Sequence, residues 1–151
     1  MTEVVFHTGV ADPLGFACRL LRKAARHGAR VRVTAPVDTL TALDRALWIF
    51  DERDFVPHLR VAGASAALAL RTPIWLVPSL QTMVDDAPLP LVVLNLGADV
   101  LDGPDGIDGL ERLIEVVSAD PDEATSGRAR WRAYKARGLA IAHHAAVAVN
   151  G

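Results

Sequence analysis

The sequence predicts an α/β fold, a single three-layer domain with a largely parallel central sheet flanked by helices. Segments typical of strands alternate with segments typical of helices, an order that indicates parallel strands joined by helical crossovers. Pro90–Leu96 is nearly all apolar, as expected of a central parallel strand that is covered on both faces. The 151 residues contain no repeat, linker or break in composition, so we expect one domain over residues 1–151.

The N-terminal third predicts two strand–helix units. Val4–Phe6 is a β-branched and aromatic run typical of a strand, and Phe16–His27 carries one apolar stripe at helical spacing. Ala29–Thr34 alternates with a period of two, which predicts a strand with its arginines on the wetter face. Thr39–Trp48 is predicted to be the second helix, because its leucines recur at helical intervals.

The C-terminal half predicts further elements of both kinds. Ile74–Val77, bracketed by prolines, is typical of a short strand. Ile107–Val117 is predicted to be a helix, because its apolar residues recur every three or four positions. A final helix, capped by Thr125 or Ser126, is expected to run to about Arg137.

Composition excludes several classes of protein. Hydrophobic residues make up 51% of the chain and charged residues 23%, which excludes a disordered chain. The single cysteine, Cys18, excludes a disulfide scaffold and an all-cysteine metal site. No apolar stretch approaches the roughly 20 residues of a membrane span, and the N-terminus lacks the basic start of a signal peptide. We therefore expect a soluble, cytoplasmic protein with no membrane partner.

Patterns that indicate catalysis or cofactor binding do not fit this chain. The turn Gly9–Pro13 is neither a glycine-rich dinucleotide fingerprint nor a phosphate-binding loop. The acidic loop Asp102–Asp108 has Pro104 at its third position and no closing glutamate, which favours a turn and helix cap over a calcium site. The adjacent His143 and His144 lack the spacing of a chelating pair on a helix. The sequence therefore predicts no catalytic residue, no metal site and no cofactor.

Positive charge is concentrated at the C-terminus. The last 28 residues hold five basic residues and no acidic one, whereas the first 123 carry a formal charge of −7. This asymmetry indicates an anionic partner, either a nucleic acid or an acidic peptide, although a solvated basic helix explains it equally well. The tail that follows, Leu139–Gly151, is rich in alanine and valine and is expected to be loosely ordered.

One face of the predicted final helix combines cations with an aromatic ring. A rotation of about 100° per residue brings together Arg128, Trp131, Arg132 and Lys135. Such a face can bind a peptide tail that has acidic and aromatic residues, or it can stack on and neutralise single-stranded DNA. Alternatively, Trp131 packs into the core and the arginines are solvated. Arg130 and Tyr134 lie toward the opposite side of the helix.

A second group of aromatic residues lies in Leu43–His58. Trp48 and Phe55 flank an acidic, irregular segment that offers few apolar partners of its own. Aromatic anchors on such segments dominate many protein interfaces, which makes this a candidate partner surface. The alternative is that both rings are tucked under the loop as a minor core.

The chain resembles the chi subunit family of bacterial DNA polymerase III over nearly its whole length. The segments that carry the resemblance are Met1–Val4, Phe16–Leu20, Leu43–Trp48, Phe50–Glu52, Phe55–His58, Leu94–Leu96 and Arg128–Lys135, with Gly138 after it. The resemblance implies a nucleotide-binding-like α/β fold without bound nucleotide. It also implies a non-catalytic accessory subunit of the clamp-loader assembly.

The resemblance further implies two partner sites. Arg128, Trp131 and Arg132, with Lys135 on the same face, would grip the acidic, phenylalanine-ended C-terminal tail of single-stranded DNA-binding protein, so that contact with DNA is mainly indirect. The second site, Trp48 and Phe55 with Pro57, would bind the psi subunit or an equivalent clamp-loader component, and also a helicase.

The chain departs from the family at the first site, and two other functions stay open. Some members place a lysine one helical turn before Arg128, where this chain has Ala124, so weaker tail binding or compensation by Lys135 is expected. The alternatives are a degenerate nucleotide-binding enzyme that acts at the carboxyl edge of the sheet, and direct binding of single-stranded DNA by the basic helix.

Overall fold

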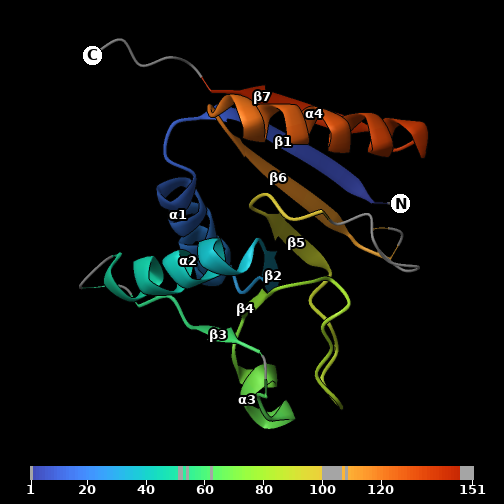
Figure 1. The fold of residues 1–151 in the computed structure, drawn as a ribbon. Coiled ribbons are helices and arrows are strands. Elements are labelled where there is room, and N and C mark those ends of the chain that lie inside the picture. Colours follow the sequence, from blue (N-terminus) through green and yellow to red (C-terminus); the bar gives the residue numbers. More distant parts are fainter. Residues whose placement is uncertain are drawn as a thin grey trace.

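Seven strands and four helices make up the described part of the chain. The computed structural model describes residues 2–50, 53, 55–61, 63–99, 107 and 109–146. The strands are β1 Glu3–Val10, β2 Val31–Thr34, β3 His58–Arg60, β4 Ile74–Val77, β5 Val92–Asn95, β6 Arg112–Ser118 and β7 Ile141–Ala145. The helices are α1 Pro13–Arg26, α2 Val37–Ile49, α3 Ala66–Arg71 and α4 Pro121–Ala136. The strands form one parallel sheet in the order β3-β4-β2-β5-β6-β1-β7 (Figure 1).

Helices cover both faces of this sheet, which confirms the predicted three-layer α/β fold. On β6, Ile114 and Val116 pack in the cluster that holds the buried residues of α1 and α2, whereas Leu113 and Val117 pack with Tyr134 of α4. Because successive side chains of a strand point to opposite faces, α4 lies on the side of the sheet opposite α1 and α2. Figure 1 shows α4 along β1 and β7 at one end of the sheet and α3 near the other end. Within the described ranges, none of the helices is both long and apolar enough to cross a membrane.

The strand and helix predictions for the N-terminal half are confirmed, but the expected exposure of the arginines on β2 is wrong for Arg32. Its guanidinium is buried, with Nε donating to the carbonyl oxygen of Pro90 at 2.9 Å and a terminal nitrogen donating to that of Leu80 at 3.3 Å. The segment between β4 and β5 covers this face of the sheet. Its backbone carbonyls then satisfy the buried charge in place of water.

Ile107–Val117 is not the predicted helix, because residues 112–118 form β6 in the middle of the sheet. This strand pairs with β5 on one side and β1 on the other, and Leu113–Val117 are all buried. Because helices cover both faces of the sheet, this strand can carry apolar residues at consecutive positions. Such a run also contains apolar residues three and four positions apart, which is the spacing of a helix. The acidic segment 102–108 lies outside the described residues, apart from Ile107.

Part of the expected loose tail forms a strand, and the last helix begins earlier than the sequence predicts. Helix α4 begins at Pro121 and not at Thr125 or Ser126, because the Asp120 carboxylate caps it by accepting the backbone N–H of residues 122 and 123 at 3.1 Å each. Residues 141–145 of the expected loose tail form β7, which pairs with β1 along its length. Residues 147–151 lie outside the described part. The short elements β3 and α3 were not predicted.

A buried polar cluster joins α4 to the sheet. The Glu115 carboxylate of β6 is fully buried. Its two oxygens share the single Nε–H of Arg130, at 3.0 and 3.2 Å, and one of them also accepts the Tyr134 hydroxyl at 2.7 Å. Burial raises the pKa of the Glu115 carboxyl, and the charge of Arg130 opposes that shift. Burial and the neighbouring Glu115 also raise the pKa of Tyr134. The Glu115 carboxylate is thus bonded to two side chains of α4, which favours one rotation of this helix on the sheet.

Replacement of Glu115 by glutamine is expected to lower the free energy of unfolding by about 3 kcal/mol, because the buried Arg130 charge loses its counter-charge. Urea unfolding followed by circular dichroism measures this change. Tyr134→Phe serves as the control, since it removes one hydrogen bond and leaves the ion pair, with an expected loss of about 1–2 kcal/mol. An equal or smaller loss for Glu115→Gln would contradict the role given to the ion pair.

Candidate functional site

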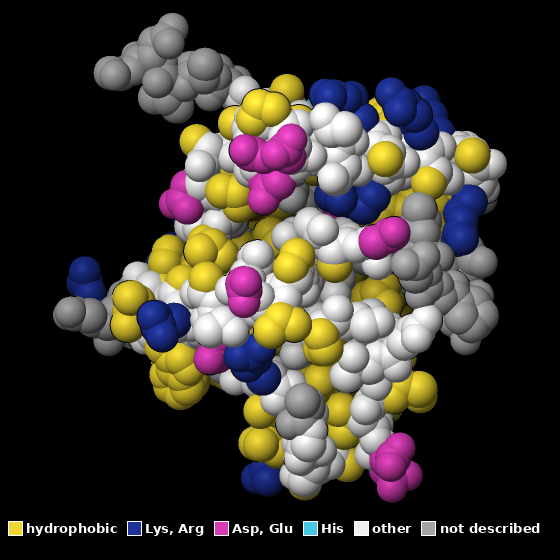
Figure 2. Space-filling view, in the orientation of Figure 1, with side chains coloured by type: hydrophobic (Ala, Val, Ile, Leu, Met, Phe, Trp, Pro, Cys, Tyr) yellow, Lys and Arg dark blue, Asp and Glu magenta, His cyan; other side chains and the backbone are white. Residues whose placement is uncertain are grey.

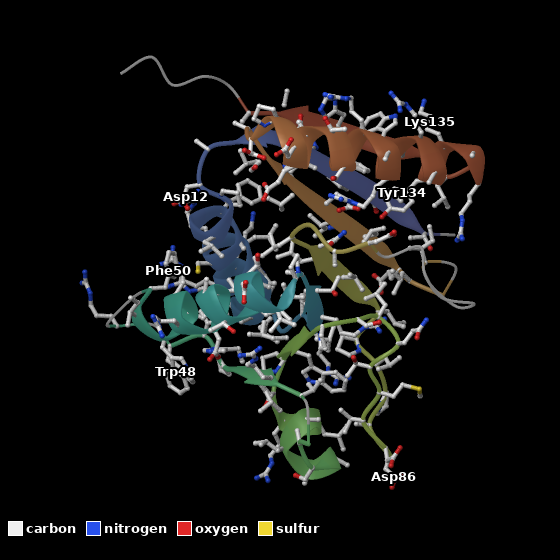
Figure 3. All side chains as sticks on the ribbon, viewed as in Figure 1. Asp12, Trp48, Phe50, Asp86, Tyr134 and Lys135 are labelled. Carbon is white, nitrogen blue, oxygen red and sulfur yellow. The ribbon has the colours of Figure 1, made fainter. Side chains whose placement is uncertain are left out.

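A groove of about 710 Å³ runs between α4 and the β1–β7 end of the sheet. Its lining comes from four elements and the turns beside them: Phe6, Thr8, Gly9, Val117, Ser118, Ala119, Ala124, Gly127, Arg128, Trp131, Arg132 and His143. Three of the predicted tail-binding residues, Arg128, Trp131 and Arg132, therefore meet in one groove. The fourth, Lys135, is exposed and lies on the outer side of α4, away from the buried Tyr134 (Figure 3).

The rotation of α4 follows from the spacing of its residues. Arg130 and Tyr134 are four positions apart, and both point inward to Glu115. Trp131 follows Arg130 by one position, about 100° around the helix, so its ring turns toward β1 instead of the centre of the sheet. This arrangement confirms that Arg130 and Tyr134 lie on a different side of the helix from the candidate binding residues.

Three rings form the aromatic wall of the groove. Trp131 packs against Phe6 of β1, with ring centroids 4.9 Å apart, and meets the edge of His143 of β7 at 5.2 Å. Trp131 is only partly buried, so it contacts the core and also lines the groove. The sequence left open that Trp131 packs into the core. The ring does contact the core, but it also lines the groove. Phe6 and His143 were not predicted as site residues, since their positions depend on the pairing of β1 with β7.

The charge on the groove is positive. Arg128 and Arg132 are exposed on α4, and no aspartate or glutamate occurs among its described lining residues. Arg128 makes a hydrogen bond at 3.2 Å to the Thr125 hydroxyl one turn earlier. Figure 2 shows dark blue lysine and arginine side chains gathered over α4. A ligand that combines carboxylates with an apolar or aromatic group would match both the charge and the wall of this groove.

Trp48 and Phe55 form a separate exposed pair at the C-terminal end of α2. Their rings pack 5.0 Å apart, yet the two residues stay 60% and 52% exposed. The alternative in which they form a minor core beneath the loop is therefore wrong. Pro57, the third predicted member of this surface, is also exposed. Figure 3 places Trp48 far from Tyr134 and Lys135 on α4, so the two candidate sites are distinct.

The buried His58 contacts both rings of this aromatic pair. His58 Nδ1 lies 2.7 Å from the carbonyl oxygen of Val56, and Nε2 lies 3.0 Å from an Asp44 carboxylate oxygen. Its ring contacts Trp48 at 5.2 Å and Phe55 at 6.1 Å between centroids. Asp44 of α2 and the chain after Phe55 are thereby joined through one side chain. Residues 51, 52 and 54, part of the segment between the two rings, lie outside the described residues.

A second cavity, of about 570 Å³, lies at the carboxyl ends of the strands, where nucleotide-binding α/β folds hold their ligand. It is lined by the starts of α1, α2 and α4. Each start carries carboxylates, namely Asp12, Asp38 and the pair Asp122 and Glu123. The N-termini of helices attract anions, but each of these three helix starts carries a carboxylate of its own. Arg130, the one cation in the described lining, is already paired with Glu115. The arrangement disfavours a phosphate ligand.

Gly127 sets how closely α4 approaches β6. A Cβ atom at this position would lie 2.9 Å from both Cγ atoms of Val117, closer than carbon atoms normally pack. Gly127 and Val117 both line the groove, so their contact fixes the separation of its two walls. The sequence signal for this contact is a glycine inside a helix that is otherwise free of glycine.

We expect Gly127→Ala to lower the free energy of unfolding by about 1 kcal/mol, because the steric cost exceeds alanine's higher helix propensity. In a Val117→Ala background the same substitution should instead raise it, because the clash is gone and the propensity gain remains. Thermal unfolding of the four proteins in this double-mutant cycle measures both effects. Destabilisation of equal size in the two backgrounds would rule out the proposed contact.

The family model of the DNA polymerase III chi subunit, HolC, matches residues 1–142, which include every strand or helix residue described above except the last three of β7. No individual curated protein matches the chain. A match over this much of the sequence is decisive for membership: the chain belongs to the DNA polymerase III chi subunit family, whose role is that of an accessory subunit in replication.

Proposed function

We propose that the protein is a non-catalytic adaptor that links single-stranded DNA-binding protein to the DNA polymerase III holoenzyme. The groove beside α4 would bind the acidic, phenylalanine-ended tail of that protein. The observation that supports this most strongly is the composition of the groove. It has an aromatic wall at Phe6 and Trp131 and two arginines, and no carboxylate occurs among the lining residues that the structure describes. Membership of the chi subunit family agrees with such a role.

Each part of the tail has a counterpart in the groove. Arg128 and Arg132, four residues apart on α4, lie on the same side of the helix, where their guanidinium groups can pair with the aspartates and the terminal carboxylate. Trp131 lies between them in sequence and provides the apolar wall for the terminal phenylalanine, with Phe6 behind it. Lys135 lies outside the groove, where it attracts the acidic tail without contacting its end.

Single-stranded DNA and nucleotides fit the molecule less well. Apart from the region around α4, the chain is acidic, which opposes a long track for a nucleic acid backbone. The cavity at the strand ends has carboxylates at three helix starts, where a nucleotide phosphate would bind. Both observations favour a short acidic peptide as the ligand, with DNA reached mainly through the partner.

Arg128→Ala/Arg132→Ala is expected to weaken binding of the tail peptide at least about tenfold, since charge-assisted hydrogen bonds are worth about 1.5–3 kcal/mol. Fluorescence anisotropy with a labelled peptide carrying the tail of the same organism's single-stranded DNA-binding protein measures the affinity. Added salt should weaken wild-type binding more than binding by the variant. The control Lys23→Ala/Arg45→Ala removes two exposed charges from α1 and α2 and should bind like wild type.

The same assay tests a variant expected to gain affinity. Ala124 lines the groove one turn before Arg128, at the position where some family members carry a lysine. Ala124→Lys adds a third cation to the groove, so tail affinity should rise about two- to fivefold at low salt. Unchanged affinity in both this variant and the double arginine variant would contradict the proposed site.

For the second surface, we propose that Trp48, Phe55 and Pro57 bind the psi subunit or an equivalent clamp-loader component, and that a helicase competes for the same rings. The supporting observation is that two packed aromatic rings stay more than half exposed while His58 and Asp44 hold them in place. Exposed aromatic residues of this kind often supply most of the binding energy of an interface.

Trp48→Ala/Phe55→Ala should abolish co-elution with the psi subunit, or its equivalent, in size-exclusion chromatography. Tail-peptide affinity should stay at the wild-type value, because the groove lies at a different part of the fold. The double arginine variant provides the reciprocal control and should retain co-elution. Loss of both tail-peptide binding and psi co-elution in either variant would indicate one shared site. That result would contradict the assignment of two separate sites.

A further inference from the structure

β7 brings a histidine to the wall of the groove. His143 pairs with Phe6 in the register of β1 and β7, and its side chain lies on the α4 side of the sheet. Its Nε2 atom is 2.7 Å from the Thr8 hydroxyl, and its ring meets Trp131 at an interplanar angle of 77°. The imidazole is therefore held in place by one polar contact and one aromatic contact.

The next residue, His144, points to the other face. It stacks on His7 with ring centroids 5.2 Å apart, and His7 in turn contacts Phe16 of α1. Burial and the neighbouring His144 lower the pKa of His7. The strand thus offers two adjacent histidines, of which one lines the groove and the other does not.

The charged side chains among the described lining residues of the groove are two arginines. The nearby carboxylates already have partners, since Glu123 accepts from the Ser118 hydroxyl and Glu115, one strand beyond Phe6, is paired with Arg130. From β1 it faces Thr8 and Phe6, and from α4 it faces Trp131, with Arg128 and Arg132 in the same groove. No carboxylate occurs among the described lining residues, so the groove supplies no counter-charge to a protonated imidazole. A bound carboxylate would supply one.

We infer that His143 is a third contact for the acidic tail and makes tail binding stronger as the pH falls. This inference rests on the proposed function of the groove. Imidazole is the side chain whose charge ordinarily changes between pH 5 and 8. The Thr8 hydroxyl can donate to the neutral ring or accept from the protonated one, so the ring keeps its place in both states. In the protonated ring, Nε2–H donates to Thr8 and Nδ1–H is left to donate to the tail.

The direction of the pH effect follows from linkage. A tail carboxylate stabilises the protonated ring, so binding is accompanied by proton uptake and weakens as the pH rises through the range in which an imidazole ordinarily loses its charge. Arg128 and Arg132 stay charged throughout this range, and the carboxylates of the tail stay ionised above about pH 5. Among the groove residues named above, histidine is the only residue type whose charge ordinarily changes between about pH 5 and 8.

Anisotropy titrations of the tail peptide at four pH values between about 5.5 and 8.5, at constant ionic strength, test this inference. Wild type should bind about two- to fivefold more tightly at the acid end than at the basic end. His143→Gln keeps a polar side chain without the charge change, and should give a flat profile near the wild-type affinity at pH 8.5. His144→Gln is the matched control and should keep the wild-type slope.

A slope that persists in His143→Gln, or disappears in His144→Gln, would overturn the role of His143. So would peptide binding by wild type that shows no pH dependence, although the proposed function would then stand. Absence of wild-type binding at every pH would overturn the proposed function itself. Melting temperatures of each variant at the two extreme pH values show whether a substitution changes folding. An NMR titration of the His143 ring with and without peptide shows whether the peptide itself changes the protonation of the ring.

Discussion

The ion pair between Glu115 and Arg130 is the constraint on which the candidate binding surface depends. A carboxylate in the middle of a sheet that is covered on both faces must be given partners, and α4 provides both Arg130 and Tyr134. Only one rotation of α4 satisfies them together. That rotation turns Arg128, Trp131 and Arg132 away from the centre of the sheet, and the close contact of Gly127 with Val117 fixes the distance. A buried polar cluster thereby determines which side chains reach solvent.

Three regions of the molecular surface differ in charge and in aromatic content. The groove at the β1–β7 end is basic and aromatic, the cavity at the strand ends carries carboxylates, and the exposed pair at the end of α2 is aromatic. The fold has the layers and parallel strands of a nucleotide-binding domain, but its helix starts carry acidic side chains where phosphate would bind. This separation suits an adaptor, because two partners can be held at once without competing for the same residues.

Much of the fold and three residues of the groove could be predicted from the sequence. The helical spacing of Arg128, Trp131 and Arg132 was sufficient to place them on one face, because side chains on a helix follow its period whatever they pack against. β6 was missed because a strand buried on both faces shows consecutive apolar residues, which also fit a helical spacing. β7 was missed because its short Ala-His-His-Ala core has no alternating apolar pattern, and backbone pairing with β1 holds it. His143 therefore became a groove residue only once the sheet order was known.

Whether the tail binds in the groove beside α4 can be tested with the three tryptophans, which report on three different places. Trp131 lines the groove, Trp48 belongs to the exposed aromatic pair, and Trp75 is buried with its indole N–H bonded to the carbonyl oxygens of Ala69 and Thr72. In a ¹H–¹⁵N spectrum of the labelled protein, the tail peptide should shift the Trp131 indole resonance in a saturable way and leave the other two unchanged. A shift of the Trp48 indole with a silent Trp131 would place the tail elsewhere and contradict the account.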